Sequence, residues 1–357
     1  MNRKIVNIVI FILLIQANLV FPQDANFSIF GNNPLYYNPA TPGVADGMQF
    51  RLNYRNVWPG IPGDFETFKF SSDIELTNLN TGLGILAMSN WEGESFLKTN
   101  QIGFCVAPTV NILQNTSISV GIMSSFVQKS IDWSKLEFDD QMDKLYGNIY
   151  KTNFSFPSAS SKSFADISTG MLFRHMIKNK NTGKYSMLNI GFAAHHVTEP
   201  DQSLIGTSQA LKAKFVVHSN YMIVHKRQAN AAFSPGFIYE RQSELETFTL
   251  GMNFFREPIY SGIWFRNRNF TMTGQDFESF IFTFGYIHDQ PRGMKWKFGY
   301  SYDATVSRLR GGSFGSHEIF YAIYFKYGLH LGKLSSKMFM KKRTEKRIKE
   351  CPPGFEY

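Results

Sequence analysis

The chain has 357 residues, beyond the size at which a single soluble core usually stops growing, whereas a membrane β-barrel escapes that limit because its wall is one sheet thick. Aromatic residues make up 16% of the sequence, yet the mean hydropathy is −0.21, which favours strands that are apolar on one face over buried helices. The net charge is +9, but outside the C-terminal tail the basic residues are scattered, which argues against a nucleic-acid-binding surface.

The N-terminus has the pattern of a secretory signal. Arg3 and Lys4 precede an apolar run over residues 5–20 that Asn and Gln interrupt, and we expect cleavage near residue 22 or 23, so that residues 1–23 are removed. A membrane-anchor helix is the alternative, but the run is short for a span, which needs about 20 apolar residues. The residues after the run include no nearby cysteine, which argues against a lipoprotein.

Residues 24–47 form an Asn- and Pro-rich segment. Asn33-Pro34 and Asn38-Pro39 are turn formers, and proline cannot donate a hydrogen bond to a β-ladder. We therefore expect this segment to line the interior of a barrel or to cap one of its mouths.

Residues 48–332 predict an all-β chain, a transmembrane antiparallel β-barrel of about 14 strands. In the first strand Phe50 and Leu52 alternate with Arg51 and Asn53, and a period of two places such neighbours on opposite faces of a sheet. The other expected strands cover residues 65–76, 82–90, 98–108, 116–127, 164–176, 185–197, 213–225, 230–240, 244–255, 259–266, 276–288 and a closing pair within 294–331.

The closing pair shows the pattern most clearly. Trp296, Phe298 and Tyr300 alternate with lysine, glycine and serine, and the last strand continues the alternation from Glu318 to about Leu331. Strands of about a dozen residues are long for a globular protein but suffice to cross a bilayer, which takes about 9–11 tilted residues. A soluble β-sandwich or a lipocalin-like barrel would also alternate, but it does not account for so many long strands with one aromatic face.

The expected connections alternate between short and long. The long ones, at 128–163, 198–212, 267–275 and 305–315, all follow odd-numbered strands, although the connection at 241–243 in the same series is short. Outer-membrane barrels have short periplasmic turns and long external loops. The pattern therefore predicts that both chain ends lie in the periplasm, including a basic tail at residues 333–357.

We find no pattern that predicts catalysis, a cofactor or a metal site, and we expect no enzyme. His195 and His196 are neighbours in an expected strand and should point to opposite faces. Asp139, Asp140 and Asp143 could bind calcium, but their spacing is not that of an EF-hand, and a solvated loop is the simpler interpretation. Cys105 and Cys351 do not indicate a disulfide framework.

Four motifs resemble those of a known family, and they occur in the family's order over nearly the whole chain beyond the signal. They are the N-terminal segment with Phe27-Ser28, Asn33-Pro34, Asn38-Pro39-Ala40 and Gly43; Tyr54-Arg55-Asn56 with Trp58-Pro59-Gly60; Asp132-Trp133-Ser134-Lys135-Leu136; and Gly315-Ser316-His317-Glu318-Ile319. Together they resemble the PorP/SprF family of type IX secretion and gliding proteins of Bacteroidetes. The sequence departs from the family at residues 44–47 and in a larger long loop.

The resemblance implies an outer-membrane barrel without enzymatic activity. It implies help in the export and surface anchoring of a secreted cargo protein, often a large adhesin, through the cargo's C-terminal sorting domain. It also implies contacts with secretion-system, periplasmic-ring or peptidoglycan-binding components. On this interpretation residues 128–163 would meet cargo, and the tail would meet periplasmic partners.

The motif residues also have structural interpretations. Tyr54 and Trp58 suit an interfacial aromatic belt, Pro59 and Gly60 suit a turn, and His317 and Glu318 could pair inside the barrel mouth. Two other functions stay open: a channel or hydrophobic-solute transporter, whose lumen residues 24–47 would leave unfilled, and a periplasmic anchor of the secretion motor that acts through its tail.

Overall fold

The computed structural model describes residues 24–28, 30–45, 47–63, 65–76, 78–93, 96–143, 145–157, 160–178, 185–206, 208–224, 231–270, 277–290, 294–306 and 312–325. The signal, the tail and the end of the last strand beyond residue 325 therefore lie outside the described residues.

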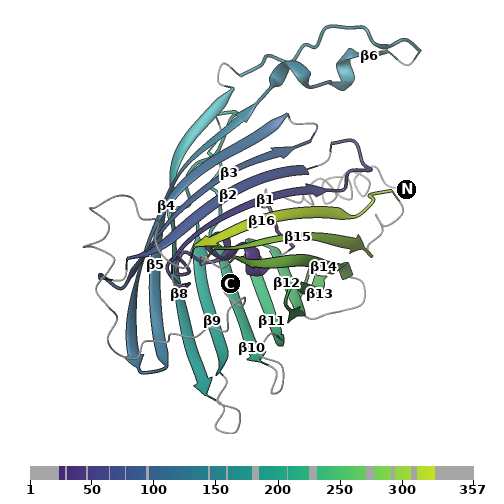
Figure 1. Ribbon diagram of the computed structural model, residues 1–357. Coiled ribbons are helices and arrows are strands. Elements are labelled where there is room, and N and C mark those ends of the chain that lie inside the picture. The colour runs from purple at the N-terminus through teal and green to yellow at the C-terminus, as the bar shows by residue number, and fades with distance from the viewer. Residues whose placement is uncertain are drawn as a thin grey trace, which may run out of the picture.

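Fourteen antiparallel strands close into one barrel, which confirms the predicted fold class (Figure 1). Strands that follow each other along the chain are neighbours in the wall, and β1 pairs with β16 to close the ring. The bounds are β1 (Met48–Val57), β2 (Phe65–Leu76), β3 (Thr81–Glu92), β4 (Leu97–Leu113), β5 (Thr116–Ile131), β8 (Ser161–Lys178), β9 (Tyr185–His195), β10 (Lys214–Val224), β11 (Ala231–Gln242), β12 (Leu245–Arg256), β13 (Ile259–Asn267), β14 (Phe277–Gln290), β15 (Met294–Thr305) and β16 (Ser316–Phe325).

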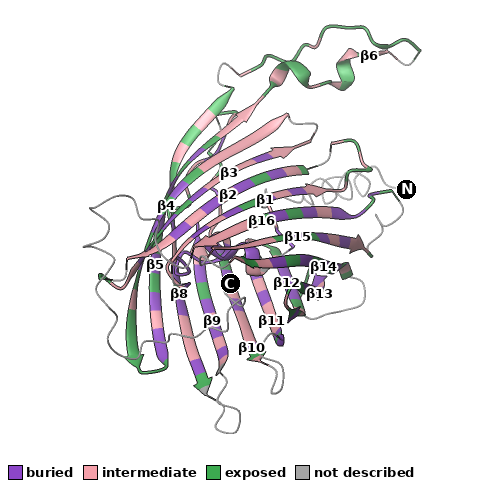
Figure 2. Cartoon of the chain, viewed as in Figure 1, coloured by how far each residue is buried: buried purple, intermediate pink, exposed green. Residues whose placement is uncertain are grey.

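The period of two appears directly as alternating burial along the strands (Figure 2). In β1, Arg51 and Asn53 are buried inside the barrel, while Leu52 between them is 53% exposed. Large apolar and aromatic side chains cover the outer face of the other strands as well, among them Phe104, Phe126, Phe282, Phe298 and Tyr300. A bilayer requires an apolar exterior, and it requires that the backbone N–H and C=O groups pair between neighbouring strands of a closed barrel.

Three neighbouring strands are longer than expected. β4, β5 and β8 have 17, 16 and 18 residues. Polar ends, such as Lys129 and Ser130, extend β5 and β8 where the hydrophobic pattern has stopped, whereas β4 continues through the apolar Val110, Ile112 and Leu113 to its turn. The connection between β5 and β8 carries two 3-10 helices, η2 (Trp133–Lys135) and η3 (Asp139–Gln141), and a small hairpin of β6 (Met142–Asp143) and β7 (Gly147–Asn148). This connection projects beyond the barrel wall (Figure 1).

Inside the barrel, two short helical turns, η1 (Phe30–Asn32) and α2 (Pro34–Tyr37), interrupt the segment before β1. In the part of the chain that the structure describes, no helix has the length and hydrophobicity needed to cross a membrane.

Candidate functional site

Residues 24–45, which we call the plug, lie inside the barrel. Phe27, Leu35, Tyr37 and Asn38 are almost completely buried, although they precede the first strand of the wall. At one end Asp24 meets the long connections, because its carboxylate contacts His196. At the other end the plug meets the short turns. Of the two positions that the sequence left open, the structure thus places the segment in the lumen.

Inward-facing glycines make room for the plug. A Cβ atom on Gly82, Gly121 or Gly170 would lie less than 3.0 Å from plug atoms, which are respectively the carbonyl of Pro42, the carbonyl of Pro39 and the side chain of Asn38. These glycines come from β3, β5 and β8, which lie close together in the wall. The wall is therefore shaped to receive residues 38–43, since any larger side chain at these positions would displace the plug.

Asn38 fastens this part of the plug. Its Oδ1 accepts a hydrogen bond from the backbone N–H of Ala40 at 2.8 Å, which holds the turn. Its Nδ2 donates to the carbonyl of Met171 at 3.0 Å and lies 3.1 Å from Nε2 of His218. One amide thus links the plug to β8 and β10, and its Pro39 neighbour lies buried beside it.

A buried ion network holds the first part of the plug. Arg55 of β1 lies between two carboxylates, 2.8 Å from Asp303 of β15 and 3.5 Å from Glu318 of β16, and none of the three side chains is more than 3% exposed. The backbone N–H of Ser28 donates to Glu318 at 2.6 Å, and its hydroxyl donates to Asp303 at 2.6 Å. Arg266 adds a second cation, 3.3 Å from Asp303.

Asn33 joins the same network. Its Nδ2 donates to Oε1 of Glu318 at 3.1 Å, an oxygen that also accepts from Asn53 at 3.1 Å. The ammonium of Lys69, fully buried on β2, donates to Oδ1 of Asn33. Pro34 follows as the first residue of α2 and is buried. Three of the motif residues, Asn33, Arg55 and Glu318, therefore meet in one place, although they come from the plug and the two strands that close the barrel.

Two of the four motifs also meet where the barrel closes. The backbone N–H of Trp58 donates to the carbonyl of Gly315 at 2.9 Å, and that of Gly60 donates to Ser313 at 3.3 Å. Gly315 has φ +73°, a conformation that favours glycine, and a Cβ on Gly60 would collide with Phe314. Pro59 is exposed at this turn, and Ser316 is buried at the start of β16.

The expectation that His317 pairs with Glu318 is wrong. The two residues are neighbours in β16, so they point to opposite faces, and Nδ1 of His317 lies 2.7 Å from the hydroxyl of Tyr300 on the outer face. Tyr54 also faces outward, where its hydroxyl donates to Glu66 at 2.8 Å.

The two adjacent histidines do not follow the expected alternation. His195 ends β9 and its Nε2 lies 3.2 Å from the carbonyl of Tyr37, while His196 has φ +55° and turns back toward the plug. Nε2 of His196 lies 2.8 Å from Asp24 and Nδ1 lies 3.0 Å from Asp166. Burial alone would lower the pKa of His196, but these two carboxylates outweigh it and raise the pKa to about 10. At neutral pH an imidazolium therefore joins the plug to the wall.

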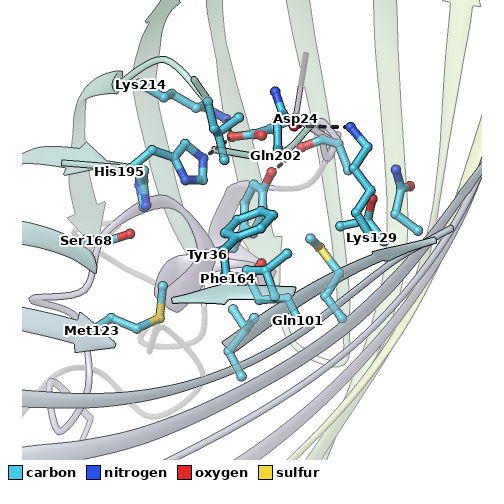
Figure 3. Close-up of a pocket in the computed structure, with 18 of the residues that line it drawn as sticks. Asp24, Tyr36, Gln101, Met123, Lys129, Phe164, Ser168, His195, Gln202 and Lys214 are labelled. Carbon is cyan, nitrogen blue, oxygen red and sulfur yellow. Dashed lines mark hydrogen bonds and ion pairs between the residues drawn. The ribbon is translucent and has the colours of Figure 1, made fainter. Parts of the chain in front are cut away.

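A cavity remains beside the plug, among the strand ends that carry the long connections. Figure 3 shows the side chains that line it in close-up. Its volume is about 80 Å³, which is enough for a small chemical group. Its walls come from the plug, from β3, β4, β5 and β8, and from the β9–β10 region, and they include Asp24, Tyr36, Lys129, His195, Gln202 and Lys214.

At the end with the short turns, inward-facing apolar side chains fill the lumen beside β8 to β16. Phe255, Tyr260 and Phe320 are part of this cluster, with methionines from three other strands. The ammonium of Lys297 lies 4.7 Å from the centre of the Tyr260 ring and donates to Asn32 of the plug at 3.3 Å. The described part of the lumen is thus packed with side chains on the side of the plug that faces the short turns.

The remaining motif lies apart from this network, on the connection of residues 132–157, which we call the arm. Trp133 packs on Phe154 and Phe156 with ring centres 6.4 and 6.5 Å apart. Lys135 is exposed and 3.7 Å from Asp132, and the backbone N–H of Leu136 donates to the carbonyl of Trp133. The four motifs therefore form two groups, one around the plug and the closing strands and one on the arm.

The arm's carboxylates bind backbone groups. Oδ1 of Asp143 accepts from the N–H groups of Leu145 and Tyr146 at 2.8 and 3.0 Å, and Asp140 accepts from Asn153 at 2.6 Å. Among the described residues no group of three His, Cys, Asp or Glu side chains is placed to hold a metal ion. Loop geometry thus accounts for two of the three aspartates considered as calcium ligands.

Sequence reasoning did not single out Lys69, Asp303 or Arg266 as parts of the site. The alternation of the sequence could have identified them, because each occupies an inward-facing position of its strand, where a buried charge needs a partner. That parity shows that a charged group faces the lumen, but it does not show which partner it meets.

Comparison with known proteins finds one matching family model and several solved structures of similar fold. The family model described as "Type IX secretion system membrane protein PorP/SprF" matches residues 19–323. No curated protein matches the chain. Solved structures that resemble it include "CymD monoaromatic hydrocarbon channel", with 11% identity, TM-score 0.46 and coverage of 84% of this chain and 93% of that one. Two others are a Pseudomonas aeruginosa FadL homologue (13%, TM-score 0.43, 83% and 94%) and the Ralstonia pickettii toluene transporter TbuX (12%, TM-score 0.45, 84% and 94%).

The family match covers most of the chain, includes all four motifs described above, and agrees with the closed barrel of the structure. The chain belongs to the PorP/SprF family of type IX secretion system membrane proteins, and it is a β-barrel of the outer membrane.

Proposed function

We propose that the protein is a non-enzymatic component of the type IX secretion system that assists the secretion of a partner cargo protein and holds the cargo's C-terminal sorting domain at the cell surface. The observation that carries this proposal is the pairing of a filled lumen with a projecting, apolar arm. A barrel of this kind offers a surface to a partner but little room for a solute.

The tip of the arm supports the proposal. Leu145 and Tyr146 are 80% and 72% exposed, and Met142, Ile149 and Tyr150 beside them are exposed as well. The loop that presents them is held by Asp140 and Asp143, so the apolar groups stay in the open rather than folding back. Exposed apolar patches rich in aromatic residues and methionine are typical of protein interaction sites.

The proposal includes an orientation. The long connections, with the arm, face the cell exterior, and the short turns and both ends of the barrel wall face the periplasm, as in other outer-membrane barrels. Contacts with periplasmic-ring or peptidoglycan-binding components would then involve the short turns and the tail.

A deletion strain tests the proposal. We expect loss of the gene to abolish secretion or surface display of one large protein, and we expect the double variant Leu145→Ser, Tyr146→Ser to reduce it strongly. Leu79→Ser is a matched control, because Leu79 is 70% exposed in the short turn between β2 and β3, at the opposite end of the barrel. An unchanged secreted proteome in the deletion strain would refute the proposed function.

The transporter alternative makes the opposite prediction for the lumen. We expect the purified barrel to carry no steady current in a planar bilayer, because the plug and the apolar cluster leave no open passage among the described residues. A stable ohmic current, or solute uptake in a strain without the secretion machinery, would favour the transporter.

A further inference from the structure

The cavity at the outer mouth contains a cation whose only described hydrogen-bond acceptor is a neutral amide. Lys129, at the end of β5, donates from its ammonium to Oε1 of Gln202 at 3.1 Å, and no described carboxylate lies within ion-pair distance of it. Other lysines nearby differ. Lys214 across the cavity is 2.8 Å from Glu240, and Lys162 of β8 is 3.2 Å from Asp201.

The amide that accepts from Lys129 is itself incompletely bonded. Gln202 is 5% exposed, and among the described residues its Nε2 has no hydrogen-bond acceptor. A buried donor without an acceptor is unfavourable, so an acceptor that reaches this wall is favoured. Glu92 is the anionic group on the same side of the cavity, and its Oε1 is occupied by the side-chain amide of Asn90 at 2.7 Å.

The lining also has an apolar part. Met88, Met123, Val127 and Leu211 border the cavity together with the ring of Tyr36. The cavity volume of about 80 Å³ suits a short apolar group rather than a long hydrocarbon chain. A ligand that suits both halves carries an oxyanion for Lys129 and Gln202 and a small apolar body for the methionines.

We propose that this cavity binds a carboxylate attached to a short apolar group, either a small free acid or the C-terminal residue of a polypeptide. The carboxylate accepts from Lys129 and from Nε2 of Gln202, and the apolar group packs against Met88 and Met123. The ligand enters from the end of the barrel with the long connections, where the cavity lies (Figure 3).

The position of the arm connects this site to a partner. β5 and β8, which supply Lys129 and Phe164 to the cavity, are the two strands that carry the arm. A protein held by the arm would therefore lie at the same end of the barrel as the cavity. The polypeptide form of the proposal rests on the proposed function, whereas the free-acid form does not.

Binding to the purified full-length barrel tests the site. The probes are a fluorescent peptide that ends in leucine with a free carboxylate, the same peptide as its amide, and sodium butyrate as a competitor. We expect the free-acid peptide to bind and the amide to bind about tenfold or more weakly, because one charge-assisted hydrogen bond pair is lost. Lys129→Met should weaken the binding of the free-acid peptide by a similar factor, whereas Lys162→Met should leave its binding unchanged.

The outcomes separate the two sources of the carboxylate. Butyrate binding that depends on Lys129, with no binding of the peptide, assigns the site to small acids and leaves the proposed secretion function standing. If the purified barrel binds the acid but deletion of the gene leaves secretion unchanged, the site is supported and the secretion function is rejected. Equal binding of acid and amide, or equal behaviour of Lys129→Met and Lys162→Met in barrels that show the same heat-dependent shift in gel mobility, would overturn the proposal.

Discussion

Arg55 and Glu318 are direct partners in the register between the first and last strands, and their side chains meet 3.5 Å apart inside the barrel. The pair is therefore part of the closure of the wall. It is also part of the seat of the plug, because Glu318 accepts from Ser28 and Asn33. The same carboxylate thus couples the closing of the barrel to the filling of its lumen.

Removal of that carboxylate should destabilise both features. Glu318→Ala removes one of the two carboxylates beside Arg55 and the acceptor of Ser28, Asn33 and Asn53. The loss of one partner from a buried ion pair costs about 3–5 kcal/mol. We expect a lower temperature for the unfolding shift in gel mobility and faster proteolysis of the plug. Glu66→Ala is the control, because Glu66 bonds Tyr54 on the outer face; an equal effect of both changes would contradict the role of the network.

The glycine groove predicts a steric effect on the plug. Gly121→Val places a side chain where the carbonyl of Pro39 lies, so the plug must shift while the outer face of β5 stays unchanged. We expect an intact barrel with increased hydrogen exchange over residues 36–45. Gly31→Ala is the matched control within the plug, because a Cβ there meets nothing within 4 Å. Unchanged exchange in Gly121→Val would show that the groove does not hold the plug.

His196 predicts a pH dependence at the end of the barrel with the long connections. Its pKa is raised to about 10 in the folded protein, whereas a histidine in the unfolded chain has a pKa of about 6.5. The ion pairs with Asp24 and Asp166 therefore make their full contribution to stability at pH values below about 6.5. This contribution declines as the pH rises and is lost as it passes through 10. The stability difference between the wild type and His196→Gln should therefore be largest near pH 6 and vanish near pH 10.5.

Thermal unfolding of the two proteins across that range measures this difference. Because the comparison is between two proteins at each pH, the titration of the lysines cancels to first order. A difference that stays constant from pH 6 to pH 10.5 would exclude the imidazolium as the source of the stabilisation.

The arm should depend on its own carboxylates. The backbone N–H groups of Leu145 and Tyr146 hold the pKa of Asp143 below its usual range, which indicates that the ionised side chain organises the tip. Asp143→Ala should increase hydrogen exchange over residues 142–150 without altering the barrel. Asp139→Ala, at a neighbouring exposed aspartate, serves for comparison, and an arm that is equally ordered in both variants would refute this account.

Much of the wall could be predicted from the sequence. In strands such as β1 and β15 the alternation of aromatic and polar residues determines which side chains face lipid, because a strand turns successive residues to opposite faces. The same parity placed Arg51 and Arg55 inside. It failed at His196, where a left-handed backbone conformation ends the alternation, and at the polar ends of β5 and β8, where pairing continues without a hydrophobic signal.

By itself, then, the sequence determined the class of fold, the inward parity of the charges and the family motifs. Only the tertiary structure decided which inward groups meet, since Ser28 and Glu318 are 290 residues apart and become neighbours only when β16 pairs with β1. The position of the plug was decided in the same way. Its proline-rich turns exclude it from the wall, but its place in the lumen depends on glycines contributed by three separate strands. Local periodicity carries no information about such contacts, because ring closure sets them.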